Sequence, residues 1–306
     1  MHARVVLLLL LSFPLLSAQE CQNVLESLRD FTSPALSEYP ELAQVRSDTM
    51  LLIYSQGGCS EKLQEFAAAG LEFLRKMDAA YAELSSSPRE AIRTAASASE
   101  ELERLEKLAP GAGELAPGIA ADARSGWRRF LEDVGEAHYR RAGEAGSTSG
   151  EISELEVALS AYTAADSPRA VMVEERLRRL REAYTEDMRV AGAALERGRE
   201  YLREAEERMR TPAGALEAYP VARDALRELR VAEYYYRLHG ERVAGEVAGL
   251  RARAEELVSE SRRGILKLFG VLVLLLAPLA AYLQGVIGAW RRDGDECRLG
   301  AELMGT

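Results

Sequence analysis

The chain has 306 residues, of which 47% are hydrophobic and only 7% aromatic, and its formal net charge is −10. Apolar positions filled mainly by Ala and Leu, with Glu and Arg between them, favour helices, because these side chains lose little freedom in a helix. Both signs of charge are interleaved along the chain, which excludes the concentrated basic face that binds nucleic-acid phosphates. We therefore expect an all-α protein with no nucleic-acid partner.

Residues 1–18 have the order of features that is typical of a secretory signal peptide. Arg4 precedes an apolar run over residues 5–16, and the small residues Ser17 and Ala18 follow it. The run is shorter than the roughly 20 residues that cross a bilayer, so export and cleavage are predicted. An uncleaved N-terminal anchor is the alternative, and both interpretations place the middle of the chain outside the cytoplasm.

The cysteines agree with export. Cys21 and Cys59 lie on the predicted exported side, and Cys297 lies beyond the C-terminal apolar segment. In an oxidising compartment the first two are predicted to form a disulfide that contributes about 3–4 kcal/mol. Two buried free thiols are the alternative.

Residues 19–109 are predicted to be an N-terminal helical region, because apolar side chains recur there every three or four residues. Two stretches rich in glycine and small or polar residues follow, at 109–118 (with prolines) and at 142–150. Such stretches are typical of loops or linkers. We therefore expect a linker-rich helical region over residues 110–149.

Residues 150–263 are predicted to form a long helical hairpin. Two heptad-like apolar seams run over residues 173–209 and 222–257, with a turn near residues 211–220. Many seam positions are Ala or Gly, so these helices need neighbours to bury enough surface. No breaker is evident before Gly264, so the second helix is expected to continue directly into the next segment.

Residues 264–290 are predicted to be a transmembrane helix, and residues 291–306 a short cytoplasmic tail. The apolar segment is long enough for the roughly 30 Å hydrocarbon layer, and Lys267 and Trp290 suit its two interfaces. Basic residues flank both ends, so the orientation is inferred from the signal peptide. The expected location is a cell membrane, with a single span and the large domain extracytoplasmic. Sixteen tail residues cannot hold a catalytic output domain.

One face of this segment carries small residues at every fourth position, namely Ala277, Ala281, Gly285 and Ala289. Small residues at this spacing let a second helix approach closely in lipid. The pattern predicts a contact with a membrane partner or a second copy, and a chance occurrence in a simple anchor is the alternative.

Three consecutive tyrosines, Tyr234, Tyr235 and Tyr236, form the one aromatic concentration. Neighbouring positions on a helix point about 100° apart, so these rings cannot all face one core. Packing on several sides inside a bundle is one interpretation, and a partner-binding spot is the other.

No motif for catalysis, a metal or a cofactor stands out. His239 falls on a seam and is expected to pack or cap; a metal role lacks a second ligand at helical spacing except Tyr236. His138 is expected on a solvated face. The Glu and Asp pairs have arginines beside them, which is typical of solvated ion pairs.

The sequence thus predicts an all-α fold: an elongated, antiparallel, coiled-coil-like helical bundle with one C-terminal transmembrane helix. The expected function is that of a non-catalytic interaction or structural protein, such as a scaffold, spacer or accessory subunit of a membrane complex. The alternative is a sensor-like domain that passes a helix shift through the span to a membrane partner. A cell-envelope enzyme is the third class of function considered, and the sequence shows no convergent polar residues that would support it.

Overall fold

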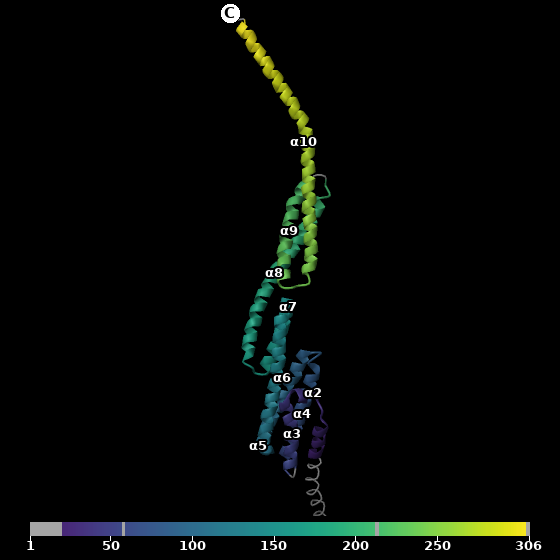
Figure 1. The fold of residues 1–306 in the computed structure, drawn as a ribbon, viewed down its shortest axis with the longest axis vertical. Coiled ribbons are helices and arrows are strands. Elements are labelled where there is room, and N and C mark those ends of the chain that lie inside the picture. The colour runs from purple at the N-terminus through teal and green to yellow at the C-terminus, as the bar shows by residue number, and fades with distance from the viewer. Residues whose placement is uncertain (1–19, 57–58, 212–213, 304–306) are drawn as a thin grey trace, which may run out of the picture. The chain divides into compact units, whose positions relative to one another are not determined.

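The structure, a computed structural model, describes residues 20–56, 59–211 and 214–303. Within these ranges every regular element is a helix and no strand occurs, as Figure 1 shows. The prediction of an all-α fold with one long apolar C-terminal helix is therefore confirmed. The predicted signal peptide, residues 1–18, lies outside the described residues.

The chain divides into two compact units, Met1–Ala183 and Tyr184–Thr306, called unit 1 and unit 2 below. Unit 1 contains a helix over residues 20–30, six complete helices and the first part of α8. These are α2 (Pro34–Glu38), α3 (Pro40–Ser55), α4 (Glu61–Glu83), α5 (Pro88–Ala112), α6 (Ala116–Glu144), α7 (Thr148–Ala164) and α8 (Arg169–Arg208).

Serines and prolines fix where several helices of unit 1 begin. The hydroxyl oxygens of Ser33, Ser60 and Ser147 each accept a hydrogen bond from a backbone N–H in the first turn of the following helix. Pro34 and Pro88 occupy first-turn positions, where a missing N–H costs no helical hydrogen bond. The helix starts are therefore set by local chemistry that the sequence displays.

Aromatic rings join α3, α4, α5 and α6 in the core of unit 1. The indole Nε1 of Trp127 donates a hydrogen bond to the Ala95 carbonyl oxygen at 2.7 Å. The Tyr39 ring meets the edges of Phe130 and Tyr81, with ring centroids 5.6 and 6.4 Å apart. Burial raises the pKa of the Tyr39 phenol above its usual range, so this core stays uncharged.

The predicted linkers over residues 109–118 and 142–150 are tight turns instead. α5 continues through Pro110, and only three residues separate it from α6; three more separate α6 from α7. Gly113, with φ 137°, lets the chain leave α5 sharply. Pro110 lies in the last turn of α5, where its missing N–H costs one bond, and burial of the α6 side chains outweighs the local glycines.

Unit 2 consists of the part of α8 from Tyr184 onward, α9 (Gly214–Leu238) and α10 (Ala244–Leu303). The predicted two-helix hairpin over residues 150–263 is wrong in two respects. Residues 150–183, in α7 and the first part of α8, belong to unit 1, and the second seam is split between two helices. Gly240, with φ 65°, takes the left-handed conformation that ends α9 and turns the chain back. α10 then packs along α9 and continues past Gly264 as expected.

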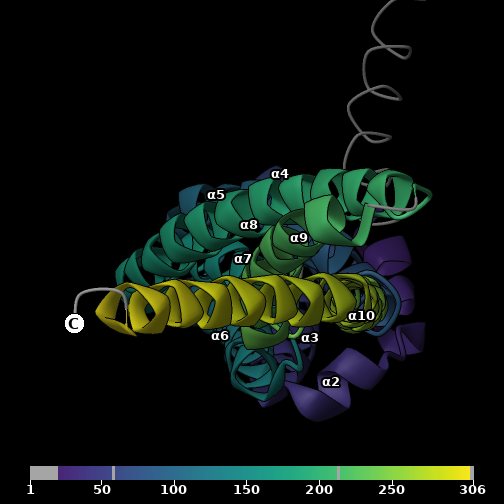
Figure 2. The ribbon, with the colours of Figure 1, turned by 90° about the horizontal axis from the view of Figure 1, so that it is seen from above.

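The three helices of unit 2 lie side by side (Figure 2). The core between them is made largely of alanine and leucine. Because many core side chains are small, the helices pack closely. A Cβ at Gly198 of α8 would lie only 2.8 Å from the Leu229 Cγ of α9. The buried core residues are Ala194, Leu195, Leu202, Ala225, Leu229, Ala232, Val247 and Ala254, with Ala205, Ala222 and Leu257 in a second cluster.

Candidate interaction surfaces

The first candidate surface is the apolar part of α10. An 18-residue stretch of this helix has a mean hydropathy of 2.3, and none of it is buried. Among the described residues α10 is the one helix long and apolar enough to cross a membrane. Large side chains such as Phe269, Leu274 and Leu275 are each more than 60% exposed, which in water would be costly.

The same helix is held firmly by the bundle before it becomes apolar. Val247, Ala254 and Leu257 are buried against α8 and α9. At the end of the packed part, the Ser261 hydroxyl donates to the Met209 sulfur at 3.3 Å. The contact ends at Gly264, where a Cβ would lie only 2.6 Å from the Cβ of Ala215. The packed and apolar parts therefore belong to one uninterrupted helix.

The predicted small-residue ladder lies on the exposed apolar part. Ala277, Ala281 and Gly285 are exposed, and a Cβ at Gly285 would meet no atom within 4 Å. The side chain of Ala289 lies outside the described ones. The structure does not place any described residue against the ladder, so its role as a helix contact stays a prediction.

The three predicted tyrosines separate, as their helical spacing requires. Tyr236 is half-buried and packs against the alanine-rich core of unit 2. Tyr234 is 62% exposed, and its ring meets the half-buried Tyr235 ring edge-on, with centroids 5.2 Å apart. One tyrosine therefore serves packing, and two belong to an outer surface.

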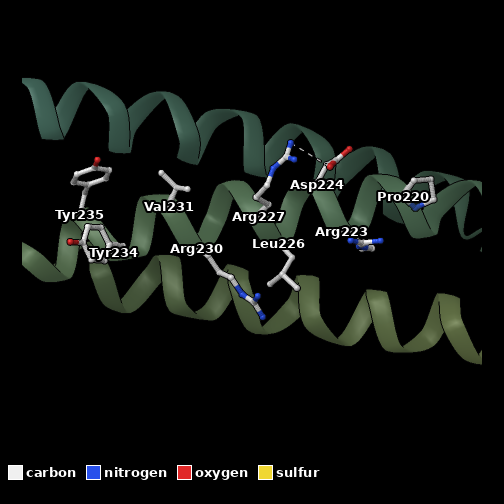
Figure 3. Close-up of a pocket in the computed structure, with 9 residues that line it drawn as sticks. All are labelled: Pro220, Arg223, Asp224, Leu226, Arg227, Arg230, Val231, Tyr234 and Tyr235. Atoms are coloured by element: carbon white, nitrogen blue, oxygen red, sulfur yellow. Dashed lines mark ion pairs between the residues drawn. The ribbon is translucent and has the colours of Figure 1, made fainter.

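A shallow groove of about 790 Å³ runs along the outer face of α9 (Figure 3). Figure 3 shows Tyr234 and Tyr235 at one end and Pro220 at the other, with the Arg227–Asp224 ion pair between them at 3.5 Å. The residues that line it all come from α9: Pro220, Arg223, Asp224, Leu226, Arg227, Arg230, Val231, Tyr234 and Tyr235. Aromatic rings and guanidinium groups are the side chains most enriched at protein interfaces.

A buried carboxylate, that of Glu233, lies behind this face. Its burial was not predicted, because Glu233 stands among many glutamates that are solvated. The Glu233 side chain is only 4% exposed and pairs with Arg251 of α10 at 2.8 Å and with Arg237 at 2.6 Å. Burying a charge in this way requires the partner to remain in place. The position of Glu233 on the alanine-rich inner face of α9 was the available clue.

The two histidines of the described residues, His138 and His239, are buried, and each meets a carboxylate. His239 Nε2 lies 2.9 Å from Asp187 Oδ2, and its ring meets Tyr184 edge-on at 5.3 Å, so the prediction that it packs agrees with the structure. The expectation that His138 is solvated is wrong, because it is 5% exposed with Nδ1 2.6 Å from Glu154 Oε2. No cluster of three metal-ligating side chains occurs within the described ranges.

The predicted disulfide is present. It joins Cys21, in the helix over residues 20–30, to Cys59, just before α4, with their Cα atoms 6.2 Å apart. Cys21 is 4% exposed. The bond ties the first described helix of unit 1 to the start of α4.

No protein-family model, curated protein or solved structure matches this chain. The exposed surfaces of α9 and α10 are therefore the features of the molecule that bear on its function.

Proposed function

We propose that this protein is a membrane-anchored interaction or structural protein without catalytic activity, acting as a scaffold, spacer or accessory subunit of a membrane complex. The observation that carries the proposal is the continuity of α10. One helix is buried in the core of unit 2 from Val247 onward and continues through Gly264 into an exposed apolar stretch. Such a helix would fix the bundle rigidly to a bilayer rather than tether it through a loop.

The proposed arrangement has unit 1 and the bundle of unit 2 outside the cytoplasm, and the residues from Arg291 inside. The signal-peptide pattern of residues 1–18 supports this orientation. The Cys21–Cys59 bond supports it independently, because disulfides persist mainly in oxidising compartments.

The outer face of α9 is the proposed protein-contact surface. It combines Tyr234, the exposed Leu238 and the groove lined by arginines, on a helix that is rigidly held from behind. Rigid aromatic side chains beside guanidinium groups lose little entropy on binding and suit a protein partner.

Site-specific photo-cross-linking in native membranes tests this proposal. A photoreactive residue replaces Tyr234 in the full chain, and the control places it at Tyr54, which is equally exposed (63% against 62%) but lies in unit 1. We expect adducts of defined mass from position 234 and not from position 54. The proposal fails if neither position yields a specific adduct and the solubilised chain neither binds a partner nor self-associates.

The continuity of α10 also favours a second candidate function, in which unit 2 senses a ligand and passes a helix shift through the span. The α9 groove would then be the ligand site. A thermal-shift screen of the detergent-solubilised full chain tests it. A stabilising small molecule whose effect disappears in Tyr234→Ala supports a sensor, and a broad panel without such a hit contradicts it.

A further inference from the structure

Leu216 is exposed at the start of α9 without an evident reason. It is 56% exposed, although its neighbour Ala215 is buried against α10. At the far end of the same helix Leu238 is equally exposed. The two leucines differ in their distance from the apolar segment of α10.

The packing of the bundle places Leu216 at the level where that segment begins. Ala215 meets Gly264, and Met209 at the end of α8 meets Ser261. With a rise of 1.5 Å per residue, Leu216 lies within about 3 Å of the level of Gly264 along the helix axis. Because the apolar run starts at Ile265, this level belongs to the headgroup layer, which is about 5–8 Å thick on each side of a bilayer.

Several exposed basic side chains lie near the level of Leu216 at this end of the bundle. Four of them have no carboxylate partner among the described residues: Arg210, Arg262, Arg263 and Lys267. The exposed acidic residues near the same level are Glu207, Glu217 and Glu260. Long basic side chains at the edge of a membrane segment extend their charged ends to lipid phosphates. An exposed leucine among such side chains is typical of a surface that lies in the interface.

We propose that this end of unit 2 is a second membrane-contact surface beside the span itself. Leu216 lies at the boundary between headgroups and acyl chains of the leaflet that α10 enters, and Arg262 and Arg263 bind lipid phosphates. The contact would hold the bundle at a fixed height and rotation on the bilayer. This inference rests on the proposed membrane anchorage and adds a surface to it.

Environment-sensitive labels at the two leucines test the proposal in the full chain. The chain carries Cys297→Ser and either Leu216→Cys or Leu238→Cys, is labelled with a nitrobenzoxadiazole fluorophore, and is reconstituted in phosphatidylcholine–phosphatidylglycerol vesicles. We expect label 216 to emit at shorter wavelength and to be quenched by lipids with a headgroup nitroxide. Label 238 should behave as in water.

The possible outcomes separate this inference from the proposed anchorage. Both labels could show the same water-like emission in a chain that resists alkaline carbonate extraction. This result overturns the proposed contact surface at Leu216 but leaves the proposed anchorage intact. A blue-shifted label 216 that labelled lipid does not quench also overturns it, in favour of cover by a second copy of the chain. Extraction of the unmodified chain by carbonate contradicts the anchorage itself.

The arginines are tested separately. The double variant Arg262→Gln, Arg263→Gln should lower the lipid quenching of label 216, whereas Arg242→Gln, at the opposite end of the bundle, should leave it unchanged. Unchanged quenching in the double variant overturns the role assigned to the two arginines.

Discussion

The absence of a side chain at Gly264 permits a close approach between α9 and α10. A Cβ there would lie 2.6 Å from the Ala215 Cβ, whereas a Cβ at Gly249 of the same helix would meet nothing within 4 Å. The two glycines therefore have opposite roles, although both stand inside α10.

Alanine substitutions at these two glycines should change stability in opposite directions. Gly264→Ala forces the helices apart and should destabilise unit 2 by about 1–3 kcal/mol. Gly249→Ala should stabilise it by about 0.5–1 kcal/mol, because alanine loses less backbone entropy in a helix. Hydrogen exchange of α9 amides, measured by mass spectrometry in detergent, reports both. Equal effects of the two substitutions would contradict the close contact.

A second prediction follows from the burial of the Glu233 carboxylate. Arg251→Leu leaves that charge with only the exposed Arg237 as a partner, and should destabilise unit 2 by about 3 kcal/mol. Adding Glu233→Leu removes the charge, so the double variant should recover most of the lost stability. Urea unfolding followed by circular dichroism measures the cycle, and purely additive losses would show that the pair is not coupled.

Individual residues were predictable from sequence where local chemistry decides the outcome. The Cys21–Cys59 pair was predicted in this way, because these are the two cysteines on the predicted exported side. The alanine-rich face of α9 was the one clue to the burial of Glu233. The burial of His138 was not predictable, because it depends on which side of a helix faces a neighbour far away in the chain. For the same reason the sequence indicated the tyrosine cluster but could not say which ring packs inward.

Helix ends, like single residues, could be predicted from the sequence only in part. Gly240 lies inside the second predicted seam, and a glycine just after a run of apolar positions is a common helix-ending position. The uninterrupted spacing of the seam concealed it, since a break between two antiparallel helices can preserve the pattern of three and four. Conversely, Pro110 and Gly118 are strong local signals for a loop, and the burial of α5 and α6 overrides them.

The exposed ladder on α10 carries a prediction about association between helices. Gly285→Leu should weaken association in a membrane two-hybrid assay, because the added side chain blocks close approach. It should leave the fold intact, since no other part of the described chain lies within 4 Å of a Cβ at that position. Ala280→Leu, on a different face of the same helix, is the matched control. Unchanged association of the Gly285 variant would assign α10 to anchorage alone.

The division of the chain into two units predicts how the whole molecule unfolds. The Cys21–Cys59 bond lies entirely in unit 1, and a closed loop of this length contributes about 4 kcal/mol in the chain-entropy model. Cys59→Ser should therefore lower the unfolding temperature reported by Trp127, which is buried in unit 1. Hydrogen exchange in α9 should stay unchanged. A parallel loss of protection in α9 would show that the two units unfold together.

The uninterrupted α10 has a geometric consequence for any partner that binds its ladder. Gly285 follows the buried Leu257 by 28 residues. At about 100° per residue, these 28 residues fall about 80° short of a whole number of turns. The ladder face of α10 is therefore rotated by about 80° from the face that packs in the bundle. Insertion of seven residues between them would change this angle by about 20°, whereas insertion of two would rotate the bundle by about 200°. The number of residues in this stretch, more than their identity, would then decide which face of the bundle a membrane neighbour meets.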